Sequence, residues 1–177
     1  WPYCERRCTY CNFNKYVSQN VDHTSMTECL IRELTTIVGL AGISQVTSVF
    51  FGGGTPSLMR PADIGRLLEV VSSLSPDPGL EVTLECNPTP AARQTLRDFK
   101  RAGVSRVSIG IQCLEDEELS RLGRTHTSED ALRCVEEAER LFRASVSVDV
   151  LYGRPGQDLQ QWLRELELVR VLNAPYL

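Results

Sequence analysis

The segment Glu81-Val-Thr-Leu-Glu-Cys-Asn87 alternates between polar and apolar side chains. The same alternation recurs in Val107-Ser-Ile-Gly-Ile-Gln112 and in Ser145-Val-Ser-Val-Asp149, and each polar set ends in a carboxylate or an amide. Parallel strands that are buried on both faces read instead as continuous apolar runs. One apolar face and one small or polar face are typical of strands around a barrel with a wet interior and chemistry at its C-terminal rim. We therefore predict a barrel rather than a doubly wound open sheet.

Helical patterns separate these strands along the chain. We expect strands over 46–51, 80–86, 104–111 and 145–151. A first helix is expected from Ser25, whose spacing to Glu28 is that of a capping box, to position 41. Further helices are expected over 61–74, 90–102, 131–142 and 162–169. Repeated βα units with short connections indicate an α/β fold with a parallel sheet, and without a repeat or a linker we expect one domain over 1–177.

Composition narrows the classes of function. Of the 177 residues 42% are hydrophobic and 24% charged, which is typical of a globular domain with a core. A formal net charge of -4 argues against nucleic-acid binding, which requires a basic face. No stretch approaches the ~18 uninterrupted apolar residues of a membrane span. The chain starts at Trp1 and ends directly after a helical pattern, so we expect a fragment of a longer chain, with any targeting segment upstream.

Three of the seven cysteines, Cys4, Cys8 and Cys11, follow the pattern C-x3-C-x2-C. Three thiolates on one loop suit a soft metal. A structural zinc ion requires four protein ligands, and no paired His or Cys stands nearby to supply the fourth. A [4Fe–4S] cluster held by three cysteines leaves one iron open to an exogenous chelator. We favour the cluster; zinc and inert core cysteines are the alternatives.

Six motifs in order resemble the radical S-adenosylmethionine (SAM) superfamily, and within it the HemW branch of the oxygen-independent coproporphyrinogen III oxidase-like group. The motifs are WPYCERRCTYCNFNKY at 1–16, FFGGGTPSL at 50–58, ECNP at 85–88, SIGIQ at 108–112, LGRTH at 122–126 and DVLYGRPGQ at 149–157. The resemblance implies an incomplete (β/α) barrel of about six strands. The first strand, the last strand and a C-terminal region would then lie outside this chain.

The resemblance also implies a set of site residues. Cys4, Cys8 and Cys11 would ligate the cluster. The positions expected to contact SAM are Tyr10, Gly53, Gly54, Thr55, Glu85, Gln112, Arg124 and Asp149. Glu85, Gln112 and Asp149 also belong to the polar strand faces described above, which is independent support. Without the resemblance, the glycines would be interpreted as a plain turn and Arg124 as a solvated charge. No catalytic residue is assigned.

Chemically, the resemblance implies that SAM chelates the open iron and is cleaved by an electron from the cluster. A 5′-deoxyadenosyl radical results, so a one-electron reductant is an expected partner. Arg6, Arg7 and Lys15 would raise the cluster potential or form solvated surface.

The other cysteines and the two histidines have plainer interpretations. Cys29, Cys86 and Cys134 fall in or beside apolar stripes and are expected to be buried, while Cys113, which follows Gln112 at the rim, is given no assignment. His23 and His126 are expected in loops, as axial haem ligands or as surface or hydrogen-bonding side chains.

Three functions remain open. The first is a haem chaperone that binds haem and delivers it to respiratory haem proteins. The second is an oxidative decarboxylase of coproporphyrinogen III, and the third is a radical SAM enzyme with another substrate. The oxidases have a further cysteine two residues after the third ligand, where this chain has Phe13, which favours the chaperone. The resemblance also implies a mitochondrial location.

Overall fold

A parallel sheet forms the centre of the computed structural model, which describes residues 1–172 and 176. Its strand order is β3-β4-β5-β6, and all neighbouring strands run parallel. The strands are β3 Ser48–Phe51, β4 Glu81–Cys86, β5 Arg106–Gln112 and β6 Val146–Val150. Tyr176 adds a parallel bridge to Ser147, beside β6. The four predicted strands are therefore confirmed, with ends that shift by one or two residues.

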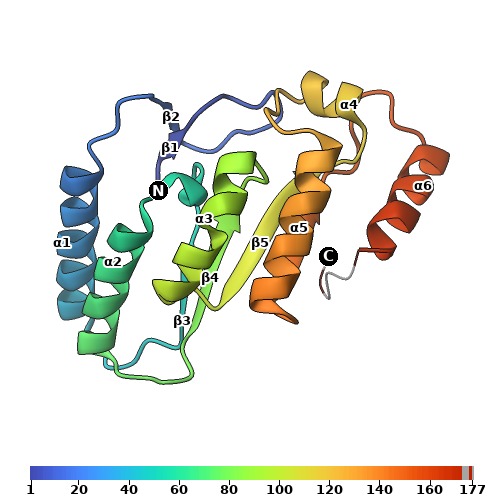
Figure 1. The fold of residues 1–177 in the computed structure, drawn as a ribbon. Helices are drawn as coiled ribbons and strands as arrows, with labels where there is room; N and C mark the ends of the chain where they lie inside the picture. The colour runs from blue at the N-terminus through green and yellow to red at the C-terminus, as the bar shows by residue number, and fades with distance from the viewer. Residues whose placement is uncertain (173–175, 177) are drawn as a thin grey trace.

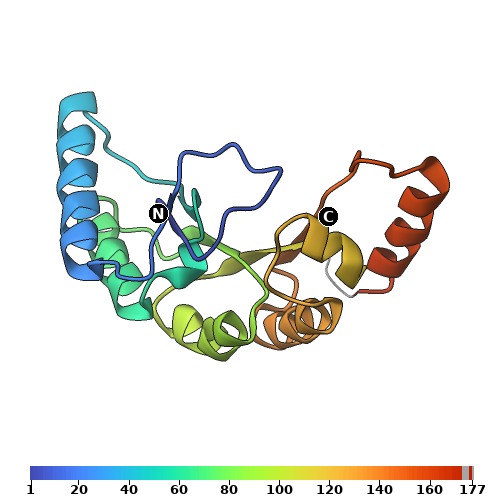
Figure 2. The ribbon, with the colours of Figure 1, turned by 90° about the horizontal axis from the view of Figure 1, so that it is seen from above.

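Helices follow the strands in the chain and lie outside the sheet (Figure 1). They are α1 His23–Ala41, α2 Pro61–Leu74, α3 Pro90–Arg101, α4 Asp116–Arg121, α5 Ser128–Phe142 and α6 Leu159–Arg170, with a 3-10 turn η1 over Pro56–Leu58. Figure 2 shows from above that the sheet curves, with α3 and α5 on its outer side and the N-terminal loop on its inner side. None of the described helices is long and apolar enough to cross a membrane.

The strand register aligns the polar side chains on the inner face. Glu85 pairs with Ser108, and Ser108 pairs with Ser147. Leu84 pairs with Val107 in the row between them. Because paired residues of parallel strands point to the same face, the polar row and the apolar row lie on opposite sides of the sheet. The alternation predicted from the sequence is confirmed.

The outer face of the sheet carries the main core. Its strand side chains are almost fully buried against α2, α3 and α5. The core includes Ile64, Leu84, Leu96, Phe99, Val107, Ile109, Ala131, Val135, Ala138, Val146 and Val148. Burial of these apolar groups is the main stabilising contribution to the fold, and it leaves the inner face free to carry polar groups.

The N-terminal segment forms a loop closed by two short parallel strands, β1 Tyr3–Cys4 and β2 Tyr16–Val17. Helix α1 then begins at His23, because the Asp22 carboxylate accepts from the backbone N–H of Ser25 and caps it. The predicted capping box from Ser25 to Glu28 is therefore wrong. His23 was expected in a loop, but it is the first residue of α1, and its ring stacks on Trp1 at a centroid distance of 5.1 Å.

Candidate functional site

A cavity of about 200 Å³ opens on the inner side of the sheet, between the strand ends and the loop that joins β1 to β2. All eleven residues that the resemblance assigned to the cluster or to SAM line it. They are Cys4, Cys8, Tyr10, Cys11, Gly53, Gly54, Thr55, Glu85, Gln112, Arg124 and Asp149. Eight further residues complete the lining, namely Arg6, Phe13, Lys15, Pro56, Cys86, Asn87, Ser108 and Gly110.

The three cysteines of the loop are free thiols at this cavity. Cys4 is buried, and the hydroxyl of Thr55 donates to its Sγ at 3.3 Å. Cys8 and Cys11 are partly exposed, and the Arg124 guanidinium lies 3.8 Å from the Sγ of Cys8. In the part of the chain that the structure describes, no group of three or more His, Cys, Asp or Glu is arranged to hold a single metal ion.

The cation Lys15 favours the ionised form of the Cys11 thiol. Burial raises the pKa of the Cys11 thiol, but hydrogen bonding from Lys15 and from the backbone of Phe13 outweighs burial, and the net pKa lies below its usual value. The Lys15 ammonium also donates to the Cys11 carbonyl at 2.7 Å. A lowered pKa increases the fraction of thiolate, which is the form that binds metals.

The glycines after β3 allow two backbone segments to touch. The N–H of Gly54 donates to the Trp1 carbonyl at 2.6 Å, and the N–H of Thr55 donates to the Tyr3 carbonyl at 2.9 Å. A Cβ on Gly54 would lie 2.7 Å from the Tyr3 carbonyl oxygen, and Gly53 has a left-handed φ of 111°. The sequence predicted glycines for close approach to a ligand. In the structure they first of all allow the close approach of the segment that leads into Cys4.

Arg124 is the most connected side chain of the cavity. One of its terminal nitrogens donates to Oδ1 of Asn87 at 2.8 Å and to the Gly110 carbonyl at 2.9 Å. The other lies near Cys8 and within 3.5 Å of the Tyr10 hydroxyl. Burial raises the pKa of Tyr10 to about 12, although Arg124 opposes the shift, so this hydroxyl stays protonated at neutral pH. The solvated-charge interpretation of Arg124 is wrong.

Two carboxylates stand on the inner face below the loop. The Ser108 hydroxyl lies 3.0 Å from both carboxylate oxygens of Asp149 and accepts from Ser147 at 3.0 Å. Burial and the nearby charge of Asp149 raise the pKa of Glu85. This pair of like charges makes the floor of the cavity attractive to a cation or a hydrogen-bond donor.

Gln112 stands at a break in the sheet. Its φ of 65° is left-handed, and the β5–β6 register shifts between Ile109 and Gln112. Its carbonyl accepts from the Leu151 N–H at 2.8 Å. Such irregularities re-aim a side chain at the end of a strand, and here the amide turns into the cavity.

His126 lies behind this break, and only 4% of its surface is exposed. Its Nε2 lies 3.3 Å from the Ile111 carbonyl. Burial lowers the pKa of His126 to about 4, and the charge of Arg124 acts in the same direction. Of the two interpretations of His126, the structure has the hydrogen-bonded one.

The remaining cysteines divide into buried and exposed. Cys86, Cys113 and Cys134 are buried, as predicted for the first and the last. Cys29 is exposed, so its predicted burial is wrong. It lies on the outer face of α1, whereas Thr27 and Val38 are the buried residues of that helix.

The sequence pattern of the Radical SAM superfamily matches residues 1–169. This chain belongs to the radical SAM superfamily. It is 51% identical over 168 residues to Radical S-adenosyl methionine domain-containing protein 1, mitochondrial, of Bos taurus, a match covering 94% of this chain and 38% of that protein. It is 36% identical to Heme chaperone HemW of Escherichia coli strain K12, a match covering 99% of this chain and 47% of that protein.

A solved structure extends these matches. Coproporphyrinogen III oxidase (HemN) from Escherichia coli aligns with a TM-score of 0.86 at 25% identity, covering 98% of this chain and 41% of that chain. The curved sheet is therefore the partial (β/α) barrel of radical SAM proteins, and the chain falls in their HemW- and HemN-like group. It spans less than half the length of these relatives.

Membership in the superfamily implies a [4Fe–4S] cluster and SAM. The donor set fits such a pair of cofactors. Three free thiols surrounded by cations suit the cluster, while a guanidinium and two carboxylates suit the zwitterionic and hydroxyl groups of SAM. Each thiolate of a cluster binds a different iron, so the thiols need not converge on one point.

Sequence reasoning missed Asn87 and Ser108 as site residues. Both belong to the polar strand faces that the alternation identified, and Asn87 is the amide that ends the first of them, but neither was assigned to the site. Their significance comes from their partners, Arg124 and Asp149, which are far away in sequence.

Proposed function

We propose that this protein is a haem chaperone that binds haem and delivers it to respiratory haem proteins, with a [4Fe–4S] cluster and bound SAM. The observation that carries the proposal is Phe13, which lines the cavity, is 60% exposed, and stands where the resembling oxidases have a further cysteine. An exposed aromatic ring that lines the same cavity as Arg6 and Lys15 suits a flat apolar macrocycle with carboxylates. The 36% identity to Heme chaperone HemW supports it.

Cys4, Cys8 and Cys11 are the cluster ligands in this proposal. The Thr55 hydroxyl donates to the Sγ of Cys4, hydrogen bonding from Lys15 helps to lower the pKa of the Cys11 thiol, and the Arg124 guanidinium lies 3.8 Å from the Sγ of Cys8. Because these cations lie close to the sulfur atoms, they also offset the negative charge of an iron–sulfur cluster. When bound, the cluster and SAM supply one-electron reduction of the SAM sulfonium, and an external reductant provides the electron.

The SAM site comprises the remaining predicted residues. Arg124, held by Asn87 and the Gly110 carbonyl, presents a donor to a carboxylate. The ends of β3, β4, β5 and β6 provide the other groups, which are Gly53, Gly54, Thr55, Glu85, Gln112 and Asp149, and Tyr10 completes the set from the cysteine loop.

A mitochondrial location belongs to the same proposal. It is supported by the relative from Bos taurus, whose name places that protein in mitochondria. Unpaired thiols and a cluster of this kind also fit a reducing interior.

Coproporphyrinogen III oxidase is the second candidate. The TM-score of 0.86 with the solved HemN structure favours it, because the two chains share the frame on which the site is built. Fold alone does not decide between the two functions, since one frame hosts many reactions. A radical SAM enzyme with another substrate is the third candidate.

The deciding experiment uses the full-length protein, reconstituted anaerobically with iron and sulfide. Haem uptake is measured by absorbance, in parallel with turnover of coproporphyrinogen III in the presence of SAM and dithionite. We expect stoichiometric haem uptake without decarboxylation. Formation of protoporphyrinogen would overturn the chaperone, and release of 5′-deoxyadenosine with neither tetrapyrrole present would support the third candidate.

A pair of variants tests the role of Phe13. Phe13→Ser removes the exposed ring at the cavity, and Leu40→Ser removes an apolar side chain that is 84% exposed on α1. We expect Phe13→Ser to weaken haem binding and Leu40→Ser to leave it unchanged. Equal haem affinity in the two variants would remove the support that Phe13 gives to the proposal.

A further inference from the structure

The loop after β6 carries the motif Gly153-Arg-Pro-Gly-Gln157, which the proposed cofactor site leaves without a role. Its conformation is fixed by its own last residue. The Oε1 of Gln157 accepts from the N–H of Gly153 at 2.7 Å and from the N–H of Arg154 at 3.4 Å. Gly153 and Gly156 both have left-handed φ values, of 71° and 80°. The loop is therefore built to hold Arg154 in one place.

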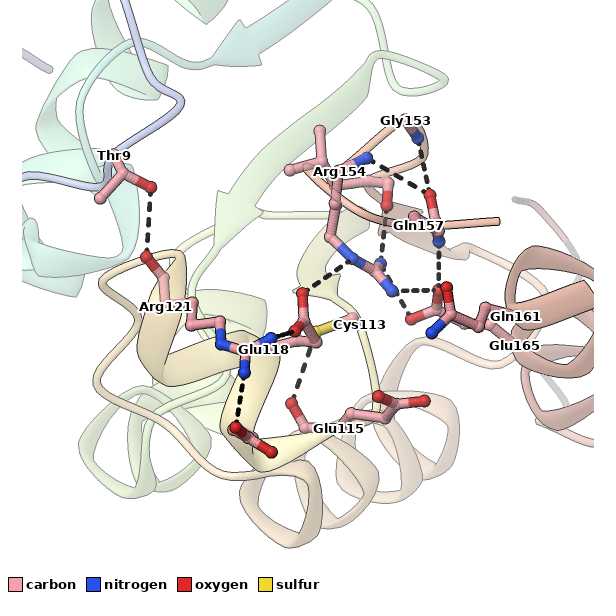
Figure 3. A network of polar contacts seen from close by, with 12 residues as sticks. Thr9, Cys113, Glu115, Glu118, Arg121, Gly153, Arg154, Gln157, Gln161 and Glu165 are labelled. Atoms are coloured by element: carbon pink, nitrogen blue, oxygen red, sulfur yellow. Dashed lines mark hydrogen bonds and ion pairs between the residues drawn. The ribbon is translucent and has the colours of Figure 1, made fainter. Parts of the chain in front are cut away.

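Arg154 points inward, and its side chain is only 4% exposed. Its guanidinium donates to the Leu151 carbonyl at 2.8 Å and pairs with Glu165 of α6 at 2.8 Å and 3.1 Å. Gln157 donates to the same Glu165 carboxylate at 3.2 Å. On its other side, Nε of Arg154 lies 3.7 Å from Oε2 of Glu118 on α4. Figure 3 shows Arg154 between these two carboxylates.

Helix α4 is the element whose position depends most on these ion pairs of Arg154. It has only six residues, fewer than an isolated helix needs for stability. Its apolar side chains, Leu119 with the adjoining Leu122, pack in a small cluster with Cys113 and Leu151 rather than in the main core. The Glu118 carboxylate has two partners. It pairs with Arg121 within α4, and it also joins α4 to Arg154.

The C-terminal end of α4 contacts the cysteine loop. The N–H of Thr9 donates to the Leu122 carbonyl at 3.0 Å. Its hydroxyl donates to the Arg121 carbonyl at 3.4 Å, as Figure 3 shows. Gly123 has a φ of 79°, and a Cβ there would lie 3.2 Å from the Arg7 carbonyl. Arg124, which reaches Cys8, is the last residue of this turn at 122–124.

We propose that Arg154 is a positioning residue for the cofactor site: by tying α4 to the loop after β6 and to α6, it holds the turn at 122–124 against the cysteine loop. The inference rests on the proposed cluster and SAM site. Arg154 touches neither the thiols nor the cavity, and it acts through Glu118, α4 and Thr9. Loss of the anchor frees α4 and loosens the loop that carries Cys8.

Two variants break the link at different points. Arg154→Met removes the guanidinium and leaves Glu165 buried without its cation, so it also lowers global stability. Glu118→Ala removes the contact between Arg154 and α4, together with the pair between Glu118 and Arg121 within α4, and leaves the pair between Arg154 and Glu165 intact. The matched controls are Arg170→Met and Glu167→Ala, which remove the two members of an exposed ion pair on α6.

The first measurement is hydrogen exchange of the full-length protein, with and without the reconstituted cluster. We expect the segments that contain Thr9 and 122–124 to exchange at least about tenfold faster in Glu118→Ala and Arg154→Met. The controls should exchange like the wild type. Unchanged exchange at Thr9 in both test variants would overturn the inference.

The second measurement is SAM affinity, followed through the electron paramagnetic resonance spectrum of the reduced cluster. We expect about tenfold weaker binding in Glu118→Ala and wild-type affinity in the controls. Faster exchange with unchanged SAM affinity would overturn the positioning role and leave the proposed function intact. A wild-type protein that takes up neither cluster nor SAM would overturn both, so the two failures are distinguishable.

Discussion

Arg124 donates to Oδ1 of Asn87 over 2.8 Å, and Nδ2 of the same amide lies 3.4 Å from Oγ1 of Thr55. Thr55 in turn donates to the Sγ of Cys4. A chain of hydrogen bonds therefore joins the turn after α4, the end of β4 and the end of β3 to the first cysteine. Asn87 is its central member, because its amide both accepts and donates.

Replacement of Asn87 by alanine tests this chain. Asn87→Ala leaves Arg124 with the Gly110 carbonyl as its remaining close acceptor, so the guanidinium loses its orientation. We expect SAM to bind about tenfold more weakly, or roughly 1.4 kcal/mol, to the reconstituted full-length protein. Asn20→Ala, at an exposed position, is the control. An unchanged dissociation constant for SAM in Asn87→Ala would show that the chain does not orient Arg124.

The cysteine assignment predicts a sharp division among serine variants. Single replacement of Cys4, Cys8 or Cys11 by serine should abolish most of the iron and acid-labile sulfide, about four of each per chain in the wild type. Cys29→Ser is the matched control, because this thiol is exposed on α1 away from the cavity. Iron, sulfide and the absorbance of the reconstituted protein are the measurements. Loss of iron in Cys29→Ser, or full iron content in Cys8→Ser, would contradict the assignment.

Much of the frame could be predicted because it is encoded locally. The alternation in β4, β5 and β6 follows from the strand period, and it correctly placed Glu85, Gln112 and Asp149 at one cavity. Helix α4 was not predicted, because six residues are too short to show a helical stripe and tertiary contacts hold them in place.

Other parts of the site depend on distant partners. Asn87 matters because Arg124, 37 positions later in the chain, reaches it, and sequence spacing alone does not indicate this contact. The burial of Cys29 was mispredicted because α1 packs with Thr27 and Val38, and not Cys29, facing the protein. Such errors arise where the orientation of a helix is set by packing and not by its own pattern.

The close contact between Gly54 and the backbone of Tyr3 predicts that one added methyl group lowers the stability of the protein markedly. In Gly54→Ala the new Cβ would lie 2.7 Å from the Tyr3 carbonyl oxygen and 2.9 Å from the carbonyl carbon of Pro2. Because both neighbours are backbone, the segment that leads into Cys4 must move. We expect a loss of about 1–3 kcal/mol in the free energy of unfolding, together with lower cluster content.

For Gly39→Ala we expect the opposite change in the free energy of unfolding. This glycine lies within α1, and nothing stands within 4 Å of its added Cβ. Alanine is the better helix former, so we expect a gain of up to about 1 kcal/mol without any change in cluster content. Chemical denaturation and iron analysis of the two variants are the measurements. A Gly54→Ala protein with wild-type stability and iron content would refute the close contact.

The burial of His126 predicts that the free energy of unfolding depends on pH. Burial, with the charge of Arg124, lowers the pKa of His126 from 6.5 to about 4 in the folded protein. Between these two values the unfolded chain binds more protons than the folded one, so the free energy of unfolding falls as the pH falls from 6.5 toward 4. The full loss is about 3 kcal/mol, and above pH 6.5 this group contributes no pH dependence.

The variant His126→Gln isolates that contribution, because an amide keeps a hydrogen-bond donor near the Ile111 carbonyl but does not titrate. Unfolding by urea is measured between pH 4.5 and 7.5 under anaerobic conditions, with His23→Gln on α1 as the control. At pH 7.5, His126→Gln should be less stable than the wild type by about 1 kcal/mol, through imperfect packing. The difference should shrink and then reverse toward pH 4.5, since the wild type alone loses stability there. A difference that stays constant across this range would show that His126 is not held neutral by the fold.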